Sequence, residues 1–354
     1  MVTTRVGTDS GTSTALSLRA PAKINLHLRV GPPGSDGFHP LVSWMCTVSL
    51  FDTLELRIRR PLSGNERGSV GDHRLITMTC DDPRLPCDES NLVVKAGRLV
   101  AGAIAEKRRG HRATREGVPS STATGATTGA TNPETGTALG ESEETAPVAV
   151  VLGKNVPFGA GLGGGSSDGA TAMLGLNRLW QGGLERDELA RLSSQCGSDL
   201  PFFFYGPSSI CTGRGEHVMP IAAPSVARWA VLILPDIAMP TPPVYRKFDE
   251  LGLGKSFDLE KMPDWLEWSN YSSNKLLPLL VNDLESAAFA LQPKLGELRN
   301  RVESRLGRPV RMSGSGSSLF TLFDERPEAE IAAKEVTTAF AVKAVAVEVS
   351  PQDT

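Results

Sequence analysis

A regular alternation of apolar and polar residues near the start of the chain predicts a β-strand. Between residues 23 and 30, apolar side chains hold every even position and polar side chains every odd one, which is the period of a strand. We expect the apolar face to lie in the core and the polar face toward solvent, with Lys23 and Asn25 adjacent on it. Residues 41–59 also show a β-type pattern, so the first part of the chain is expected to be mostly strand.

The rest of the chain mixes helix-like and strand-like patterns. Apolar residues recur at helical spacing in three segments, so one stripe of each helix would face the core. Short apolar runs bounded by turn residues predict three further strands. The expected elements are helices at 91–107, 168–180 and 187–196 and strands at 147–152, 231–234 and 319–323.

Two features of composition divide the chain. Residues 119–146 are mostly Thr, Ser, Gly and Ala with hardly a large apolar side chain, so this segment cannot bury enough surface to offset its ordering entropy. We expect a disordered surface insertion over about residues 112–146. A connection rich in Pro and Ala at 220–224 precedes a new strand and predicts a domain boundary. It would separate an N-terminal domain, 1–222, from a C-terminal domain, 223–354.

Charge, hydropathy and cysteine content exclude several classes of protein. The 354 residues include 37 basic and 40 acidic side chains, a formal net charge of −3, which leaves no broad basic surface for nucleic acid. No run of 18 apolar residues occurs, and residues 1–14 lack the apolar core of a signal peptide. We therefore expect a cytoplasmic protein with no membrane partner. The five cysteines form no CxxC pair, so reduced thiols are expected.

The segment with the clearest chemistry is the glycine-rich stretch PFGAGLGGGSS at residues 157–167, directly before an expected helix. Glycine clusters let backbone N–H groups approach a ligand closely. A helix N-terminus, expected at Ser166, Ser167 and Asp168, adds unpaired donors and the positive end of the helix dipole. The stretch predicts an anion site suited to phosphate, with a flexible turn as the alternative. No GK[ST] follows, so it is not a P-loop.

Four short motifs, in a fixed order, connect the chain to a known family. They are PAKINLHL near the N-terminus, PFGAGLGGGSSDGA in the middle, CGSDLPFF after it and MSGSGSSLF near the C-terminus. Together they resemble the GHMP kinase superfamily. Within it, PAKIN, DGFH at 36–39, the GGGSS loop and PTP at 240–242 most resemble the family of 4-diphosphocytidyl-2-C-methyl-D-erythritol kinases.

The resemblance implies an α+β protein with the two-domain GHMP kinase fold. An N-terminal nucleotide-binding domain and a C-terminal ferredoxin-like α/β sandwich would enclose the site in the cleft between them. ATP and Mg²⁺ are the implied cofactors, and the implied reaction transfers the γ-phosphate to the 2-hydroxyl of 4-diphosphocytidyl-2-C-methyl-D-erythritol in non-mevalonate isoprenoid precursor biosynthesis. A GHMP kinase for mevalonate, homoserine or a sugar, and a non-catalytic sensor with the same fold, are the alternatives. A monomer or weak homodimer is expected.

The same resemblance assigns roles to individual residues. Asp199 matches the catalytic aspartate that accepts the hydroxyl proton, and Lys23 matches the lysine near the reacting oxygen and the γ-phosphate, as phosphoryl transfer requires. Without the family, Asp199 also suits a turn or cap, and Lys23 a solvated charge. The positions implied to bind ATP are Asn91, Lys154, Pro157, Gly159, Gly161, Leu162, Gly163, Gly164, Gly165, Ser166 and Ser167. The positions implied to bind or enclose the acceptor are Asn25, Phe38, His39, Thr241, Tyr245, Ser313, Gly314 and Gly316. Of these, the Tyr245 ring would stack on cytosine, and no residue is assigned to a metal.

Overall fold

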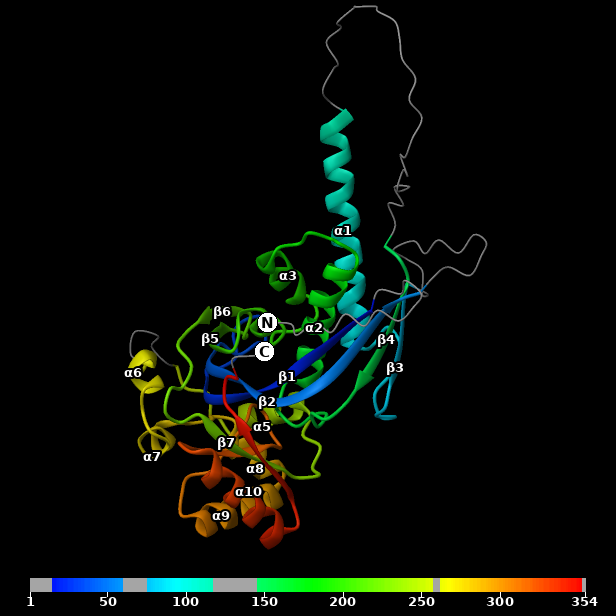
Figure 1. Ribbon diagram of the computed structural model, residues 1–354. Helices are drawn as coiled ribbons and strands as arrows, with labels where there is room; N and C mark the ends of the chain where they lie inside the picture. The colour runs from blue at the N-terminus through cyan, green and yellow to red at the C-terminus, as the bar shows by residue number, and fades with distance from the viewer. Residues whose placement is uncertain (1–14, 60–74, 117–144, 257–261, 352–354) are drawn as a thin grey trace, which may run out of the picture.

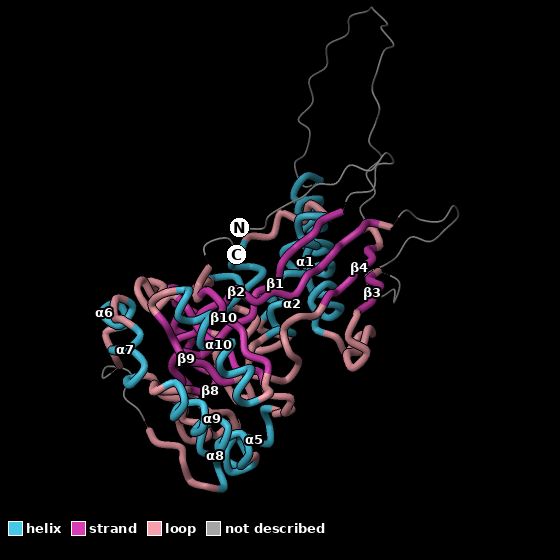
Figure 2. The backbone as a smooth tube through the Cα atoms, turned by 60° about the horizontal axis from the view of Figure 1, so that its bottom comes forward, coloured by secondary structure: helices cyan, strands magenta, loops and turns pink. Residues whose placement is uncertain are grey.

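Two β-sheets face each other in the protein, and helices cover the outer side of each (Figures 1 and 2). The computed structural model describes residues 15–59, 75–116, 145–256 and 262–351. Helices and strands are mixed along the whole chain, which confirms the expected α+β class.

The first sheet is formed by residues that precede residue 221. Its strand order is β3-β4-β2-β5-β6, with β1 paired antiparallel to β2. β3 and β4 are parallel, and the other neighbours are antiparallel. The strands are β1 (Ala15–Val30), β2 (Leu41–Ile58), β3 (Ile76–Cys80), β4 (Val148–Gly153), β5 (Ser208–Gly213) and β6 (His217–Pro220).

The second sheet has the order β10-β7-β9-β8 and is antiparallel throughout. Successive side chains of a strand point to opposite faces. Val231 and Ile233 of β7 therefore pack against helices, while Ala230 and Leu232 pack against the first sheet. The strands are β7 (Trp229–Leu234), β8 (Arg311–Met312), β9 (Leu319–Phe323) and β10 (Lys343–Glu348).

Three large clusters of buried apolar side chains join these layers. One lies between the first sheet and the helices α1 and α2, a second between the two sheets, and a third between the second sheet and helices α5, α8, α9 and α10. The helices are α1 (Leu92–Glu116), α2 (Gly164–Leu179), α3 (Arg186–Ser193), α4 (Phe202–Tyr205), α5 (Thr241–Glu250), α6 (Trp265–Ser269), α7 (Ser273–Leu276), the 3₁₀ helix η2 (Leu277–Leu279), α8 (Glu285–Leu291), α9 (Pro293–Leu306) and α10 (Arg326–Phe340).

The expectation that the polar face of β1 lies toward solvent is wrong. Lys23, Asn25 and His27 are buried, with exposed fractions of 3%, 3% and 5%. Both faces are covered because the first sheet lies between helices α1 and α2 on one side and the second sheet on the other. The polar face lines the site described below, and Trp265 and Trp268 pack edge-on against the His27 ring.

Helix boundaries depart from the expected ones in both directions. α2 begins at Gly164, not at residue 168, because Gly163 adopts the left-handed conformation (φ 67°) that caps the helix and tertiary packing overrides the low helix propensity of glycine. α3 ends at Ser193, three residues before the expected end. α1 continues to Glu116, beyond the expected end at 107, because the Arg, Ala and Glu residues that follow favour helix.

The start expected for the insertion, residue 112, is also too early. Residues 112–116 belong to α1, whose last turns extend away from the rest of the described structure (Figure 1). Thr145 is buried, and the carbonyl of Ala146 accepts a hydrogen bond from Trp180 Nε1 at 2.8 Å. The remainder of the expected insertion, residues 117–144, lies outside the described residues.

Candidate active site

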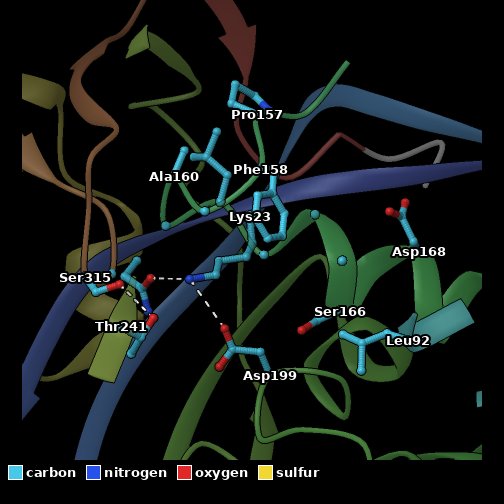
Figure 3. Close-up of a pocket in the computed structure, with 18 of the residues that line it drawn as sticks. Lys23, Leu92, Pro157, Phe158, Ala160, Ser166, Asp168, Asp199, Thr241 and Ser315 are labelled. Atoms are coloured by element: carbon cyan, nitrogen blue, oxygen red, sulfur yellow. Dashed lines mark hydrogen bonds and ion pairs between the residues drawn. The ribbon is translucent and has the colours of Figure 1, made fainter. Parts of the chain in front are cut away.

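A cavity of about 450 Å³ lies where the glycine-rich loop, β1 and segments of the C-terminal half meet (Figure 3). Its lining comes from α2, β1, the turn before α4, the start of α5 and the turn between β8 and β9. These segments are distant in sequence, so the fold assembles the cavity.

The glycine-rich loop ends at the N-terminus of α2, on the wall of the cavity. Gly159, Gly161 and Gly163 have φ values of 66°, 76° and 67°, which residues with a Cβ rarely adopt. Gly164, Gly165 and Ser166 form the first turn of α2 and line the cavity. N–H groups of a first helical turn have no partner within the helix. This end of the cavity is therefore built to receive an anion.

Lys23 and Asp199 lie close together on the cavity wall, next to the glycine loop. Lys23 Nζ lies 3.6 Å from Asp199 Oδ2, and the Lys23 side chain is only 4% exposed while that of Asp199 is 36% exposed (Figure 3). Asn25 Oδ1 accepts a hydrogen bond from Lys23 Nζ at 2.6 Å, and Asn25 Nδ2 donates to Ser43 Oγ at 2.7 Å. The lysine is thus held in one orientation, with a carboxylate beside it that remains open to the cavity.

The turn at residues 313–318 closes on the glycine loop. Ser313 Oγ donates to the carbonyl of Gly161 at 2.9 Å, and Ser318 N donates to the carbonyl of Ala160 at 3.0 Å. A Cβ on Gly161 would lie 2.1 Å from the Ser313 carbonyl oxygen. No side chain fits there, so glycine is required for the two segments to touch.

Thr241 and Tyr245, both in α5, form the wall beyond Asp199. Thr241 Oγ1 lies 3.0 Å from Ser315 Oγ, which joins α5 to the same turn (Figure 3). The Tyr245 ring is tilted against the ring of His39, with centroids 5.0 Å apart. Burial, and to a smaller extent the charge of Asp199, raise the pKa of Tyr245 to about 12. Its hydroxyl therefore stays protonated at neutral pH.

His39 and Phe38 do not line the cavity. His39 is buried behind Tyr245, where its Nδ1 lies 2.9 Å from the carbonyl of Gly31 and its Nε2 lies 3.4 Å from Asp249 Oδ1. Phe38 is 52% exposed, and the guanidinium of Arg214 lies 3.8 Å from its ring centroid. The Phe38 ring therefore lies at the surface, outside the cavity.

Asn91 and Lys154 line the cavity, but their side chains are already engaged. Asn91 Oδ1 accepts from Val93 N at 2.9 Å, so it caps α1. The Lys154 ammonium contacts the carboxylates of Asp52 and, at 2.7 Å, Asp168. Burial, more strongly than the negative charge of Asp52, raises the pKa of Asp168, while Lys154 opposes the rise; the resulting pKa is about 7.

Most of the residues implied by the resemblance are brought together. Those on the cavity wall are Lys23, Asn25, Asn91, Lys154, Pro157, Gly159, Gly161, Leu162, Gly163, Gly164, Gly165, Ser166, Asp199, Thr241, Tyr245 and Gly314. Those off the wall are Ser167, Phe38, His39, Ser313 and Gly316. Ser167 is fully buried, and its N–H bonds the Gly163 carbonyl within the helix.

Several lining residues were not expected from the sequence. An apolar section of the wall between α1 and the glycine loop is formed by Leu85, Pro86, Leu92 and Phe158. Phe158 is 63% exposed. What the sequence does show is a large aromatic residue inside the glycine-rich motif, and that position is the signal that points to it. Asp168 directly follows the GGGSS motif, yet nothing in the sequence connects it with Lys154.

Comparison with known proteins identifies the class of protein to which the chain belongs. The model for the N-terminal domain of GHMP kinases matches residues 121–207, and the model for their C-terminal domain matches residues 258–342. A crystal structure of mevalonate kinase has a TM-score of 0.58 over 95% of this chain and 99% of that chain, at 11% identity, which shows the shared fold alone. The fold and the site together define an ATP-dependent GHMP kinase that acts on a small molecule.

Relatives with higher sequence identity to this chain identify the family within the GHMP kinases. A 4-diphosphocytidyl-2-C-methyl-D-erythritol kinase of Acaryochloris marina is 32% identical over 92% of both chains, and one of Salinispora tropica is 34% identical over 92% of this chain and 89% of the relative. A crystal structure of 4-(cytidine 5'-diphospho)-2C-methyl-D-erythritol kinase is 29% identical, with a TM-score of 0.66 over 95% of this chain and 100% of that chain. The chain belongs to the 4-diphosphocytidyl-2-C-methyl-D-erythritol kinase family, and the resemblance drawn from its motifs is confirmed.

Proposed function

We propose that this kinase transfers the γ-phosphate of ATP to the 2-hydroxyl of 4-diphosphocytidyl-2-C-methyl-D-erythritol, in the non-mevalonate route to isoprenoid precursors. The observation that carries the proposal is the position of the Lys23–Asp199 pair, which shares one cavity with the N-terminus of α2. An anion site and an acid–amine pair on one cavity are what phosphoryl transfer to an alcohol needs. The names of the family members supply the acceptor.

In this proposal the phosphates of ATP bind at the glycine loop. Backbone N–H groups of Gly163 to Ser166 bind them, and the positive end of the α2 dipole adds to the attraction. The apolar wall that includes Leu92 and Phe158 would receive the adenine ring. Asn91 and Lys154 border the same wall, and we propose that they shape it through their bonds to the protein.

Asp199 would accept the proton of the attacking hydroxyl. Two carboxylates line the cavity, and that of Asp199 is the more exposed. The other, Asp168, is 2% exposed and bonded to Lys154. Lys23 would stabilise the developing alkoxide and the negative γ-phosphate. Because Asn25 Oδ1 bonds Lys23 Nζ, we propose that Asn25 orients the lysine and does not grip the distant cytidine end.

The acceptor would extend from Asp199 along α5. Thr241 and Tyr245 line that side, and a stacked cytosine on Tyr245 would contribute roughly 1–3 kcal/mol. His39 supports the Tyr245 ring from behind, and Phe38 offers a second exposed ring. Ser313, Gly314 and Gly316 would act by closing the turn onto the glycine loop.

Mg²⁺ bound with ATP fits this donor set. Within the described ranges, no group of three His, Cys, Asp or Glu side chains could hold an ion by itself. Kinase Mg²⁺ is usually held by one or two carboxylates together with substrate phosphates; because Asp199 is assigned as the base, the ATP phosphates at the glycine loop would supply most of the ligands here. When bound, the ion neutralises charge on the transferred phosphoryl group.

The proposal is tested by measuring ADP release from ATP, Mg²⁺ and the diphosphocytidyl substrate. A panel with mevalonate, homoserine and sugars, compared by kcat/KM, separates this substrate from the other GHMP acceptors. We expect turnover only with the diphosphocytidyl alcohol. ADP release no faster than with ATP alone would overturn the proposal, and a preference for another acceptor would reassign the substrate.

Three further expectations stay predictions. We propose domains over 1–222 and 223–354, since the first sheet ends at Pro220 and the second begins at Trp229. No helix in the described ranges has the length and apolar character needed to cross a membrane. A cytoplasmic location and a monomer or weak homodimer are retained as expectations.

A further inference from the structure

The segment Val281 to Glu285, which we call the clamp, contacts both sides of the active site. It follows η2 and ends at the first residue of α8, and its residue Asn282 pairs with Leu28 of β1 in a parallel bridge. Leu28 N donates to the Val281 carbonyl at 2.8 Å, and Asp283 N donates to the Leu28 carbonyl at 3.0 Å. The clamp thus extends the first sheet from the second half of the chain.

Asp283 holds the end of β1. Its Oδ2 accepts from Val30 N at 2.9 Å and from Arg29 Nε at 3.0 Å. Because Lys23 and Asn25 stand on the same strand, a fixed strand end also limits movement of these two side chains.

Asn282 holds the turn at residues 313–318. Its Nδ2 donates to the carbonyls of Met312 and Gly314, at 2.8 Å and 2.7 Å, and its Oδ1 accepts from Leu284 N at 3.0 Å. A carbonyl only accepts, so both donors of the amide must face the turn. Asn282 is 7% exposed. Loss of its two donated hydrogen bonds would leave the carbonyls of Met312 and Gly314 without this partner at a buried position.

The held part of the turn lies directly against the reactive groups. A Cβ on Gly314 would lie 3.1 Å from Asn25 Oδ1 and 3.4 Å from Lys23 Nζ. The neighbouring Ser313 Oγ accepts from Asn25 N at 3.2 Å and donates to the Gly161 carbonyl. A shift of the turn would therefore disturb its contacts with the Lys23–Asn25 pair on one side and with the glycine loop on the other, and so change how the two sides are placed relative to each other.

We propose that Asn282 is a positioning residue for phosphoryl transfer, which sets the distance between the Lys23–Asn25 pair and the phosphate loop by holding the turn from behind. Asn282 is not among the residues that line the cavity. The inference rests on the proposed role of Lys23, and it predicts a loss of turnover that exceeds any loss of nucleotide affinity. Misplacement of a reacting group by about 1 Å can reduce a rate by roughly a hundredfold.

The test variant is Asn282→Asp, which has nearly the same shape. Its carboxylate still accepts from Leu284 N but donates nothing to the turn. The matched control is Asn177→Ala. Asn177 also exchanges two side-chain bonds with backbone, to the carbonyl and N–H of Leu184, but it stands at the far end of α2, roughly 20 Å from Gly164 at 1.5 Å per residue.

We expect kcat of folded Asn282→Asp to fall at least tenfold, with the KM for ATP within threefold of wild type. Asn177→Ala should lose stability but keep kcat, and Asn282→Ala extends the test if the carboxylate prevents folding. Amide hydrogen exchange at residues 312–318 should accelerate in the Asn282 variants alone. A kcat within twofold of wild type, or unchanged exchange in the turn, overturns the inference. Absence of turnover in the wild-type enzyme counts against the proposed function only, because the exchange measurement still tests the clamp.

Discussion

Replacing Asp168 with Asn is expected to remove a contribution that makes the free energy of unfolding fall as the pH rises. Asp168 is 2% exposed, its Oδ2 lies 2.7 Å from Lys154 Nζ, and its Oδ1 has no hydrogen-bond partner among the described residues. Lys154 also contacts Asp52, whose other oxygen accepts from two backbone N–H groups. Two buried carboxylates share one ammonium, so the less supported one keeps a proton up to higher pH. Burial, and secondarily the negative charge of Asp52, raise the pKa of Asp168 from 3.8 to about 7, although Lys154 opposes the rise.

The sign follows from the protons bound in each state. Between about pH 4 and pH 7 folded Asp168 holds a proton that the unfolded chain has released, so the free energy of unfolding falls as the pH rises. At 1.36 kcal/mol per pH unit, the cost above pH 7 reaches up to about 4 kcal/mol. His27 acts oppositely. Burial, and secondarily Arg29, lower its pKa from 6.5 to about 4, so its contribution raises stability as the pH rises from 4 to 6.5, by up to about 3 kcal/mol.

The two contributions oppose each other in the wild type, and each variant should expose the other. Chemical denaturation at several pH values between 4.5 and 7.5 measures this. We expect the free energy of unfolding of Asp168→Asn to rise relative to that of the wild type as the pH increases toward 7, since the amide oxygen can still accept from Lys154. His27→Gln should show the opposite slope. Asp236→Asn, which removes an exposed carboxylate, is the control. A difference between Asp168→Asn and wild type that does not change with pH would refute the reasoning.

Three further substitutions test the site. Gly161→Ala should lower stability by about 1–3 kcal/mol more than Gly159→Ala, and it should also weaken ATP binding. Both glycines have positive φ, but of the two only a Cβ at Gly161 meets another atom, the Ser313 carbonyl oxygen at 2.1 Å. Equal effects of the two substitutions in denaturation and nucleotide titration would contradict this. Asp199→Asn should lower kcat by roughly 10²–10⁴-fold with little change in ATP affinity, and undiminished turnover would refute its role as base. Asn91→Ala should lower stability by about 1 kcal/mol through loss of the α1 cap; an unchanged unfolding midpoint would show that the cap contributes nothing.

Elements with a strong local pattern were predicted well. The strands expected at 41–59, 147–152, 231–234 and 319–323 lie within two residues of β2, β4, β7 and β9, because alternation and short apolar runs report directly on burial. Helix ends were predicted less well. The start of α2 depends on a left-handed Gly163 that packs against Lys23, and no local pattern reports such a contact.

The burial of the β1 polar face could not be predicted for a similar reason. Alternation shows that the two faces differ, but it does not show what covers the second one. Here the glycine loop covers Lys23, the turn at 313–318 covers Asn25, and Trp265 and Trp268 pack against His27.

By itself the sequence determined the phosphate-binding device, since a glycine loop and the helix that follows it are contiguous and need only local backbone geometry. It also determined the family, through motifs whose order along the chain is directly visible. Only the tertiary structure brought Lys23 to Asp199, Lys154 to Asp168 and Asn282 to the turn at 313–318. These contacts join segments that only the packed sheets bring together, and hydropathy periodicity, which reports burial of one residue at a time, contains no information about which buried polar groups become partners.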